Sequence, residues 1–314
     1  MYNYACVCLQ MRVSSLVFFY LTLILGVPGN AFVVYVAGLK MKRTVNTVGF
    51  LNLAIADLLC CLSTLYYITK SAFDNPWPYG SIMCKIVPFI MLITRFASIF
   101  TLNLISLDRF VQVMTPVWAQ NHRSLFIARL SCATTWILAS VLSLPFMMLR
   151  ETHTNNNKTY CRLYQHDDDS FELYGRLSII RFVFGFLVPL ICITTCYGFI
   201  ARKLGRSHFH SGRAFRIILA VIMAFFLCWL PYHIVRLIIM YGKRSSRLVA
   251  LAVNQLAISF GYFNSCLNPI LYVFMGQDFK SNVKLSLRRV FERVFSEEGI
   301  QASRSTQPQH THSV

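Results

Sequence analysis

The chain has 314 residues, of which 56% are hydrophobic and only 13% are charged. Soluble domains carry about 25% charged residues, so this composition excludes an ordinary soluble enzyme as well as a disordered chain. Lys and Arg (30) outnumber Asp and Glu (12), and the bases stand mostly between apolar runs. That placement favours a membrane-orientation signal over nucleic-acid binding, so no nucleic-acid partner is expected.

Seven apolar runs are long enough for helices that cross a membrane, which need about 17–25 residues. Barrel strands are excluded because they are about 10 residues long and alternate in polarity. The runs are Val13–Leu39, Thr47–Ile68, Ile82–Met114, Phe126–Leu149, Leu173–Ala201, Ala214–Met240 and Leu248–Met275. We therefore predict an all-α membrane protein, with an extracellular N-terminus over residues 1–12 and a seven-transmembrane helix bundle over residues 13–275.

The first run could also be the apolar core of a signal peptide at Leu16–Leu25. It continues through Gly29-Asn30 to Lys40, which favours a membrane helix. Lys and Arg are more frequent in the loops that face the cytoplasm if the N-terminus lies outside. A glycosylation sequon at Asn157 agrees with this orientation, and we predict a multi-pass plasma-membrane protein.

The chain after the seventh run has two parts. Residues 277–295 alternate bases with apolar residues at helical spacing, which predicts a short amphipathic eighth helix on the membrane surface. Residues 296–314 are polar and are expected to form a disordered cytoplasmic tail. Its phosphorylation candidates are Ser303, Ser305, Thr306, Thr311 and Ser313.

Two of the 11 cysteines stand apart from the rest. Cys84 lies at the outer start of the third run and Cys161 lies in the outer loop after the fourth, so both face an oxidising compartment and a disulfide between them is expected. Whether Cys6 and Cys8 pair stays open. The zinc-type CxxC spacing is missing from the sequence.

Charged residues within the runs are costly, at least about 2.5–3.5 kcal/mol each, and are therefore functional candidates. Among them we single out Asp57, Arg95, Asp108, Arg109, Arg181 and Arg236. Snorkelling to the membrane interface is an alternative for Arg236. GxSxG, P-loop and HExxH motifs are missing, so no enzyme is expected. Leu248–Met275 also has no Lys for a retinal Schiff base.

The motifs, each on its own run, resemble those of the rhodopsin-like (class A) G-protein-coupled receptors. They are Gly29-Asn30, Leu53-Ala54-x-x-Asp57, Asp108-Arg109-Phe110, Trp136, Pro189 with Tyr197, Phe225-x-x-Cys228-Trp229-x-Pro231 and Asn268-Pro269-x-x-Tyr272. The resemblance implies a sodium pocket at Asp57, Ser98, Asn264 and Asn268, with no other metal or cofactor. It also implies an activation switch made by Asp108, Arg109, Phe225, Trp229, Pro231, Tyr197, Pro269 and Tyr272.

The same resemblance implies the partners. They are a heterotrimeric G protein of the inhibitory class, arrestin, receptor kinases and membrane lipids. Further segments resemble the chemoattractant branch, most nearly the complement component 3a anaphylatoxin receptors, with component 5a and formyl peptide receptors close behind. These segments are Leu25–Thr47, Asp57–Leu62, Trp77–Gly80 and Gln120–Arg123.

The expected ligand is a peptide that ends in a carboxylate. The third run has no acid from Ile82 to Leu107, while arginines suit two hydrogen bonds to a carboxylate. The resemblance implies that Arg150 and Arg181 hold that group. This sequence differs from the branch at two points. Asn254 stands where the branch usually has an acid, near the start of the seventh run, and the second outer loop, Glu151–Glu172, is short. The full set of expected ligand-binding residues is Arg150, Arg181, Arg95, Arg236, Met91, Tyr232, Asn254 and Tyr262.

An acidic patch in the outer loop is expected to attract a cationic peptide. It comprises Asp167, Asp168, Asp169 and Glu172, with Tyr164 and Tyr174 as sulfation candidates. We therefore predict a peptide receptor of chemotaxis and inflammation. A component 5a or formyl-peptide receptor, a non-signalling decoy receptor and a receptor for a carboxylate metabolite remain as alternatives.

Overall fold

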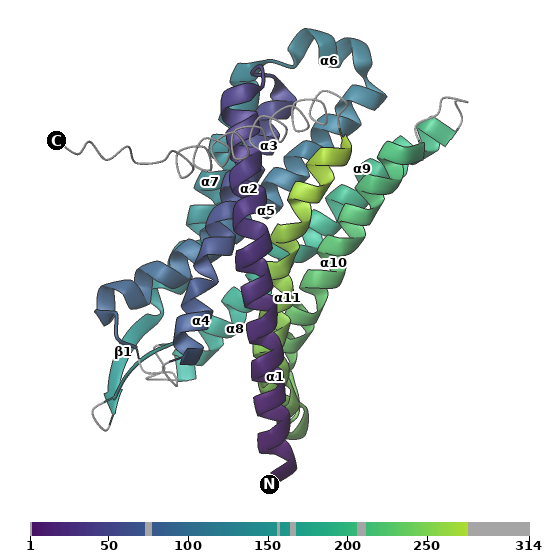
Figure 1. The fold of residues 1–314 in the computed structure, drawn as a ribbon. Coiled ribbons are helices and arrows are strands. Elements are labelled where there is room, and N and C mark those ends of the chain that lie inside the picture. Colours follow the sequence, from purple (N-terminus) through teal and green to yellow (C-terminus); the bar gives the residue numbers. More distant parts are fainter. Residues whose placement is uncertain (1, 73–76, 156–157, 164–167, 206–211, 276–314) are drawn as a thin grey trace, which may run out of the picture.

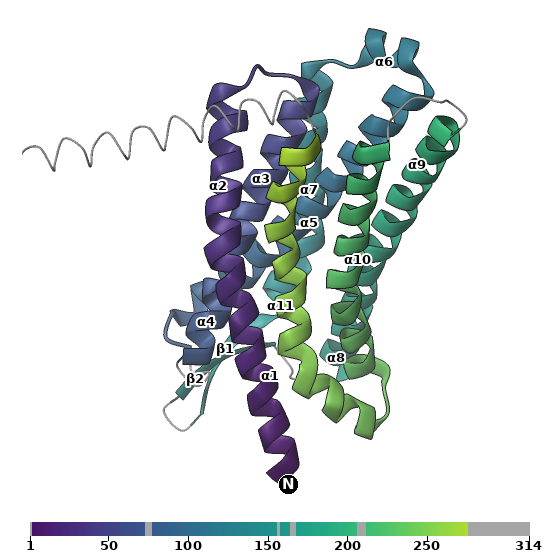
Figure 2. The same ribbon diagram turned by 45° about the vertical axis from the view of Figure 1, so that its right-hand side comes forward.

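The computed structural model describes residues 2–72, 77–155, 158–163, 168–205 and 212–275. Long helices lie side by side in a bundle, with a short β-hairpin at one end (Figures 1 and 2). The N-terminus, α4 and the hairpin lie at the same end, called the hairpin end below. The short helix α6 lies at the opposite end, called the α6 end.

Seven helical rods form the described bundle, and several of them contain more than one element. In chain order the elements are α1 (Tyr2–Leu21), η1 (Thr22–Gly26), α2 (Val27–Tyr35), η2 (Val36–Lys40), α3 (Val45–Ser63), α4 (Leu65–Ala72), α5 (Gly80–Met114), α6 (Pro116–His122), α7 (Leu125–Met148), β1 (Arg150–Asn155), β2 (Lys158–Leu163), α8 (Asp168–Phe182), η3 (Val183–Leu187), α9 (Val188–Gly205), α10 (Gly212–Tyr241) and α11 (Arg244–Met275). The all-α membrane fold predicted from the sequence is confirmed.

Six helical stretches in the described part of the chain are long and apolar enough to cross a membrane. The seventh predicted span, α11, is more polar because its buried face carries Ser259, Asn264, Ser265 and Asn268. It still lies along α10 inside the bundle. The first rod begins at Tyr2 rather than near Val13, so the described residues before the apolar run continue the helix.

The outer surface of the bundle is apolar. Leu39 is 75% exposed, Phe126 73% and Leu227 65%. Soluble monomers rarely expose apolar surface on this scale, whereas helices in a bilayer turn such side chains to the lipid. The polar side chains are instead buried between the helices, so the bundle has the polarity expected of a membrane protein.

Two rods contain a wide π-helical turn just before a proline. η1 ends two residues before Pro28, and η3 ends two residues before Pro189. Proline lacks an N–H and its ring crowds the preceding turn, so a wider turn relieves the clash. The side chain of Asn30 donates hydrogen bonds to the carbonyls of Gly26 (2.9 Å) and Ser265 (3.0 Å), which ties this bend to α11.

Two helices begin at side-chain caps at the α6 end. The hydroxyl of Thr44 accepts a hydrogen bond from the N–H of Thr47 at the start of α3 (3.2 Å). The hydroxyl of Ser124 does the same for the N–H of Ile127 at the start of α7 (3.3 Å). Each cap satisfies an N–H that has no partner within its helix, which fixes where the chain re-enters the bundle.

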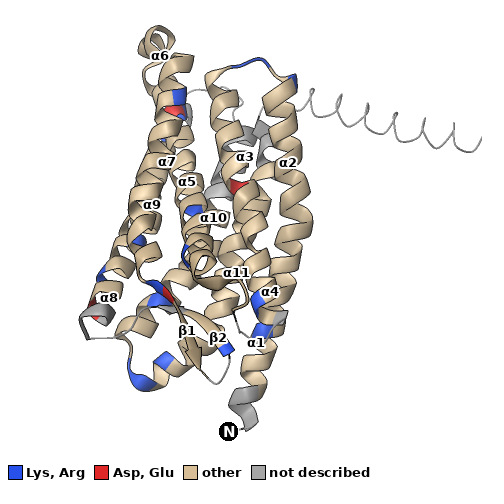
Figure 3. Ribbon diagram, turned by 90° about the vertical axis from the view of Figure 1, so that its left-hand side faces the viewer, with Lys and Arg blue, Asp and Glu red and all other residues tan. Residues whose placement is uncertain are grey.

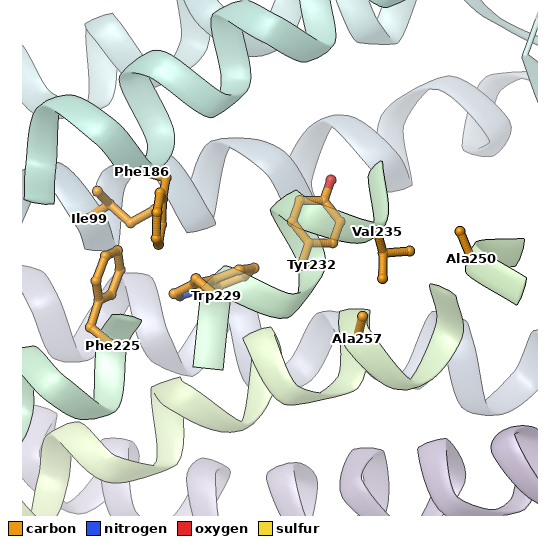
Figure 4. Packing of buried hydrophobic residues seen from close by; sticks show 8 residues of the cluster. All are labelled: Ile99, Phe186, Phe225, Trp229, Tyr232, Val235, Ala250 and Ala257. Carbon is orange, nitrogen blue, oxygen red and sulfur yellow. The ribbon is translucent and has the colours of Figure 1, made fainter. Parts of the chain in front are cut away.

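The central core joins α5, η3, α10 and α11 (Figure 4). Its buried members are Ile99, Phe186, Phe225, Trp229, Tyr232, Val235, Ala250 and Ala257. Gly261 lets α11 approach the indole of Trp229, because a Cβ atom there would lie only 2.3 Å from a ring carbon. The position of Trp229 is therefore coupled to the contact between α10 and α11.

The segment between α7 and α8 contains a β-hairpin. β1 pairs with β2 in antiparallel register, with Thr152 opposite Cys161. The disulfide Cys84–Cys161 joins β2 to the start of α5, as expected. The backbone N–H of Trp77 also donates to the carbonyl of Thr159 (2.5 Å), so the hairpin is attached to the bundle at two points.

Candidate ligand-binding site

A cavity of about 290 Å³ opens between the helices near the hairpin end. All eight residues predicted to bind a ligand line it, and they come from α5, α10, α11, the start of β1 and α8. These residues are far apart in the sequence, and the bundle brings them to one place. Figure 3 shows several basic positions toward this end of the molecule.

The sequence analysis missed two cations of the cavity wall, Arg12 and Lys70. Arg12 lies beyond the predicted first span, and Lys70 follows the predicted second span. The Nε atom of Arg12 donates to the hydroxyl of Ser71 (3.0 Å), and its Nη2 atom donates to the carbonyl of the same residue. The part of α1 before Val13 therefore adds one wall of the cavity. The hydropathy pattern did not indicate that the helix begins so early.

Arg95 forms the floor of the cavity and is 8% exposed. Its guanidinium carbon lies 3.5 Å from the ring centre of Trp229 and 4.3 Å from that of Tyr232. Its Nη2 atom lies 3.2 Å from Nε2 of His233. A cation over an aromatic face gains about 0.5–2 kcal/mol, whereas burying an ion costs several kcal/mol. These neutral contacts orient Arg95 but leave most of its charge uncompensated.

Arg181 and Arg236 extend the basic wall along α8 and α10. Arg181 donates from Nη1 to the hydroxyl of Tyr232 (2.7 Å) and lies 3.8 Å above the ring of Phe146. Arg236 lies 5.2 Å from the ring centre of Tyr174. Its position on the cavity wall argues against snorkelling to the lipid interface, the alternative weighed from the sequence.

Three polar atoms around the cavity are buried and have no hydrogen-bond partner among the described residues. They are Nε of Arg181, Nε of Arg236 and Oδ1 of Asn254. Buried polar groups are nearly always paired, so a water, a ligand or a movement of these side chains would be needed to satisfy the three atoms. Two of the three are donors on cations, which is the chemistry that an anionic group satisfies.

Asp57 lies fully buried midway along α3. Its Oδ1 atom accepts a hydrogen bond from the hydroxyl of Ser98 (2.8 Å), and its Oδ2 atom accepts one from Nδ2 of Asn268 (2.6 Å). Asn264 is also buried, in α11 one turn before Asn268. Both of these partners are neutral, and no cation pairs with the carboxylate among the described residues, so the group suits a hard cation that prefers oxygen ligands. The described residues contain no group of three His, Cys, Asp or Glu that could hold a metal.

Asp108 lies near the α6 end of α5. It pairs with Arg123, at 2.7 Å from Nε to Oδ1 and 2.9 Å from Nη2 to Oδ2, and it also accepts a hydrogen bond from Nε2 of Gln112 (2.6 Å). Its ion-pair partner therefore comes from outside α5, since Arg123 follows α6. The role of Asp108 and Arg109 in an activation switch stays a prediction.

The remaining switch residues are only partly described. Phe225 and Trp229 pack in the central core, and Tyr197 is buried in a neighbouring cluster with Ile193 and Ile200. Pro231 and Pro269 lie inside α10 and α11. The side chain of Tyr272 lies outside the described part of the structure.

Several other predicted sites lie outside the described residues or side chains. They are the sequon Asn157, Tyr164, Asp167, the side chains of Asp168 and Asp169, residues 277–295 and the tail with its five phosphorylation candidates. Glu172 is exposed and pairs with Arg176 (2.6 Å). Tyr174 lies in the cavity wall, where its ring meets Phe146 and Arg236.

The sequence matches the family described as "7 transmembrane receptor (rhodopsin family)" over residues 29–272. The chain therefore belongs to the rhodopsin family of seven-transmembrane, G-protein-coupled receptors, and it is a receptor rather than an enzyme. It is 67% identical to a C3a anaphylatoxin chemotactic receptor of Danio rerio, over 97% of this chain and 84% of that protein.

Other relatives widen the comparison. A C3a anaphylatoxin chemotactic receptor of Oncorhynchus mykiss is 52% identical, over 91% of this chain and 80% of that protein. The human N-formyl peptide receptor 2 is 38% identical, over 92% of this chain and 87% of that protein. The relatives thus support a chemoattractant receptor that crosses the membrane several times, most similar to C3a receptors.

Proposed function

We propose that this chain is a receptor for a complement anaphylatoxin peptide of the C3a type and holds the C-terminal carboxylate of that peptide in the basic cavity. The observation that carries the proposal is the charge of the cavity wall. Arg95, Arg150, Arg181 and Arg236 line one cavity, and no Asp or Glu does so among the described residues. The C3a receptors of Danio rerio and Oncorhynchus mykiss, its relatives at 67% and 52% identity, support the same ligand class.

The peptide enters from the extracellular side in this proposal, with the N-terminus and the hairpin outside the plasma membrane. Its carboxylate accepts hydrogen bonds from Arg181 and Arg150, because a guanidinium presents two parallel N–H donors to two oxygens. The carboxylate then approaches Arg95, whose guanidinium lies on the face of Trp229. Binding is therefore linked to the core that joins α5, α10 and α11.

Signalling in this proposal runs through a heterotrimeric G protein of the inhibitory class, with receptor kinases and arrestin acting on the C-terminal tail. Movement of α10 at the α6 end opens a groove for a helix of the G protein, a helix-in-groove mode of binding. The sequence motifs Asp108-Arg109 and Asn268-Pro269-x-x-Tyr272 support a signalling receptor over a decoy. A sodium ion at Asp57, Ser98, Asn264 and Asn268 belongs to the resting state in the same proposal.

G-protein activation in cells that express this chain tests the ligand. The panel contains C3a peptide, the same peptide without its terminal Arg, C5a and a formyl peptide. A response to C3a peptide is expected, and Arg181→Ala should weaken it about 10–100-fold, since hydrogen bonds to charged groups contribute about 1.5–3 kcal/mol. Arg176→Ala is the matched control, because Arg176 lies on the same helix with its side chain exposed and paired with Glu172.

A receptor for a small carboxylate metabolite is the second candidate function. The cavity volume of about 290 Å³ is at the low end for drug-sized ligands, so a small carboxylate would fit inside it. A response to short-chain carboxylates and none to any of the four peptides, with surface expression confirmed, would favour this candidate. Silence to both classes would favour a decoy receptor.

A further inference from the structure

A second cavity, the α6-end cavity, has a volume of about 290 Å³ and lies between α3, α5, α6 and α7. It is separate from the basic cavity, since the two share no lining residue. The part that lies further from α6 is lined by small and apolar side chains, among them Leu104 and Ile105 of α5 and Ala128 of α7. The volume is at the low end of the range for small-molecule sites, which is about 300–1,000 Å³.

The α6-end cavity opens on the lipid-facing surface of the bundle. Three of its lining residues are large apolar side chains that are exposed, namely Leu107, Trp118 and Ile127. Trp is enriched where a membrane meets water, so Trp118 is expected at the level of the lipid head groups. A molecule dissolved in the bilayer therefore reaches the cavity from the side, and such a molecule carries an apolar chain.

The charged groups of the cavity gather toward the α6 end. Asp108 and Arg109 lie within the last two turns of α5, His122 ends α6, and Arg123 follows directly. The described wall thus holds two arginines and one acid, so its net charge is positive whether His122 is neutral or protonated. Such a wall attracts an anionic head group and repels a cationic one.

Side-chain contacts fix the shape of this charged end. Arg123 binds Asp108 through two hydrogen bonds (2.7 and 2.9 Å) and also donates to Oδ1 of Asn46 in α3. The ring of His122 stacks on that of Trp118 with 4.6 Å between ring centres, and its Nδ1 atom donates to the carbonyl of Trp118 (3.1 Å). Arg123 is committed to these two partners. The positive charge left to meet an anionic head group is therefore that of Arg109.

We propose that the α6-end cavity binds a free fatty acid, with its chain between α5 and α7 and its carboxylate toward Arg109. The exposed apolar mouth explains entry from the bilayer, the apolar part of the cavity takes the chain, and the positive wall takes the carboxylate. The small volume favours a single chain over a phospholipid with two. The site does not depend on the peptide ligand proposed above.

Photolabelling of the purified full-length receptor in nanodiscs of neutral phospholipid tests the site. The probe is a dodecanoic acid analogue with a photoreactive diazirine in its chain, and mass spectrometry locates the cross-links. Cross-links are expected at the cavity-lining residues of α5 and α7, and excess dodecanoic acid should suppress them. Ala128→Phe, which enlarges a lining side chain, should lose these cross-links. Ala133→Phe, an exposed position of the same helix outside the cavity, should keep them.

Two comparisons at alkaline pH, where the acid is ionised, test the head group. Dodecanol has the same chain without a charge, so it should compete with the probe about 10-fold or more weakly than dodecanoic acid. This factor follows from the contribution of a hydrogen bond to a charged group. Arg109→Gln should weaken competition by the acid by a similar factor and leave competition by the alcohol unchanged.

The position of the cross-links in the wild type decides the question if Ala128→Phe does not fold. Cross-links spread evenly over the lipid-facing surface would overturn the site, as would equal labelling of the wild type and a folded Ala128→Phe. Equal competition by the acid and the alcohol would overturn the carboxylate contact. Loss of the cross-links when an anionic phospholipid replaces the neutral one would assign the cavity to a phospholipid and overturn the fatty acid.

Discussion

Arg95 connects the cavity to the core, and this position gives a prediction at the scale of one residue. Its guanidinium lies on Trp229 and next to His233. Arg95→Met should reduce agonist potency by about 10–100-fold, because the variant removes a charged hydrogen-bond donor. Arg95→Lys keeps the charge but not the planar contact, so it should recover part of the potency and change basal signalling.

Concentration–response curves for G-protein activation, with and without agonist, measure both effects. Arg247→Gln is the control for a general loss of positive charge at the hairpin end. If Arg95→Met and wild type had the same potency and basal activity, Arg95 would be a structural residue with no part in recognition.

Asp57 supports a second prediction, because its carboxylate is buried between neutral partners. Sodium should lower agonist affinity in the wild type, and Asp57→Asn should remove this effect, since a neutral amide does not offset a cation. Agonist binding is measured in sodium and in N-methylglucamine at equal ionic strength. An undiminished sodium effect in Asp57→Asn would place the cation elsewhere.

The sequence identified four of the six cations that line the cavity. A charge inside an apolar run is conspicuous, so Arg95, Arg181 and Arg236 could be found without a structure. Arg12 and Lys70 could not, because they lie at the ends of runs, where bases are common. The partner of Asp108 was also missed, since Arg123 follows α6 and only the fold brings it back.

At the scale of the elements, the contact of α10 with α11 depends on Gly261. An added Cβ atom would lie 2.3 Å from the ring of Trp229, so the ring or the helix must shift. Gly261→Ala should therefore destabilise the receptor by about 1–3 kcal/mol, the usual cost of overpacking. The measurement is the thermal midpoint of the purified protein.

Gly198→Ala is the matched control for this substitution. An added Cβ atom at Gly198 meets nothing within 4 Å. Since Gly costs about 0.5–1 kcal/mol relative to Ala inside a helix, this variant should be slightly stabilised. Equal losses in both variants would mean that Gly261 is not needed for the approach of the two helices.

The helices were predictable as elements because each carries one long apolar run. The hairpin was not, since the strand Arg150–Asn155 has no apolar residue and so shows no alternation of apolar and polar side chains. Its register depends on β2, on the disulfide Cys84–Cys161 and on the contact of Trp77 with Thr159. These contacts arise from tertiary structure. The same holds for the start of α1, where the helix continues beyond the apolar run to enclose the cavity.

At the scale of the whole molecule, the disulfide stabilises the hairpin over the cavity. It closes a loop of 77 residues. Removing such a link typically costs about 2–5 kcal/mol, so Cys84→Ser with Cys161→Ser should lower the thermal midpoint and surface expression. Ligand binding should fall with it, because Arg150 starts the strand that pairs with the strand of Cys161. Cys60→Ala with Cys266→Ala is a control for the loss of two cysteines, since both are buried and free. An equal effect in that variant would contradict the stabilising role of the disulfide.

The orientation of the whole chain gives the last prediction. Many bases of the hairpin end line the cavity, including Arg150, Arg181 and Arg236, so they are not available to lipid headgroups. Exposed bases remain at both ends, Arg176 and Arg247 at the hairpin end and Lys42 and Arg43 at the α6 end. We expect those of the α6 end to face the anionic inner leaflet. The disulfide at the hairpin end agrees, because such bonds persist in oxidising compartments.

An epitope added before Met1 should bind antibody on intact cells, and one added after Val314 only after permeabilisation. The reverse pattern would place the basic cavity in the cytoplasm and exclude an extracellular peptide as its ligand.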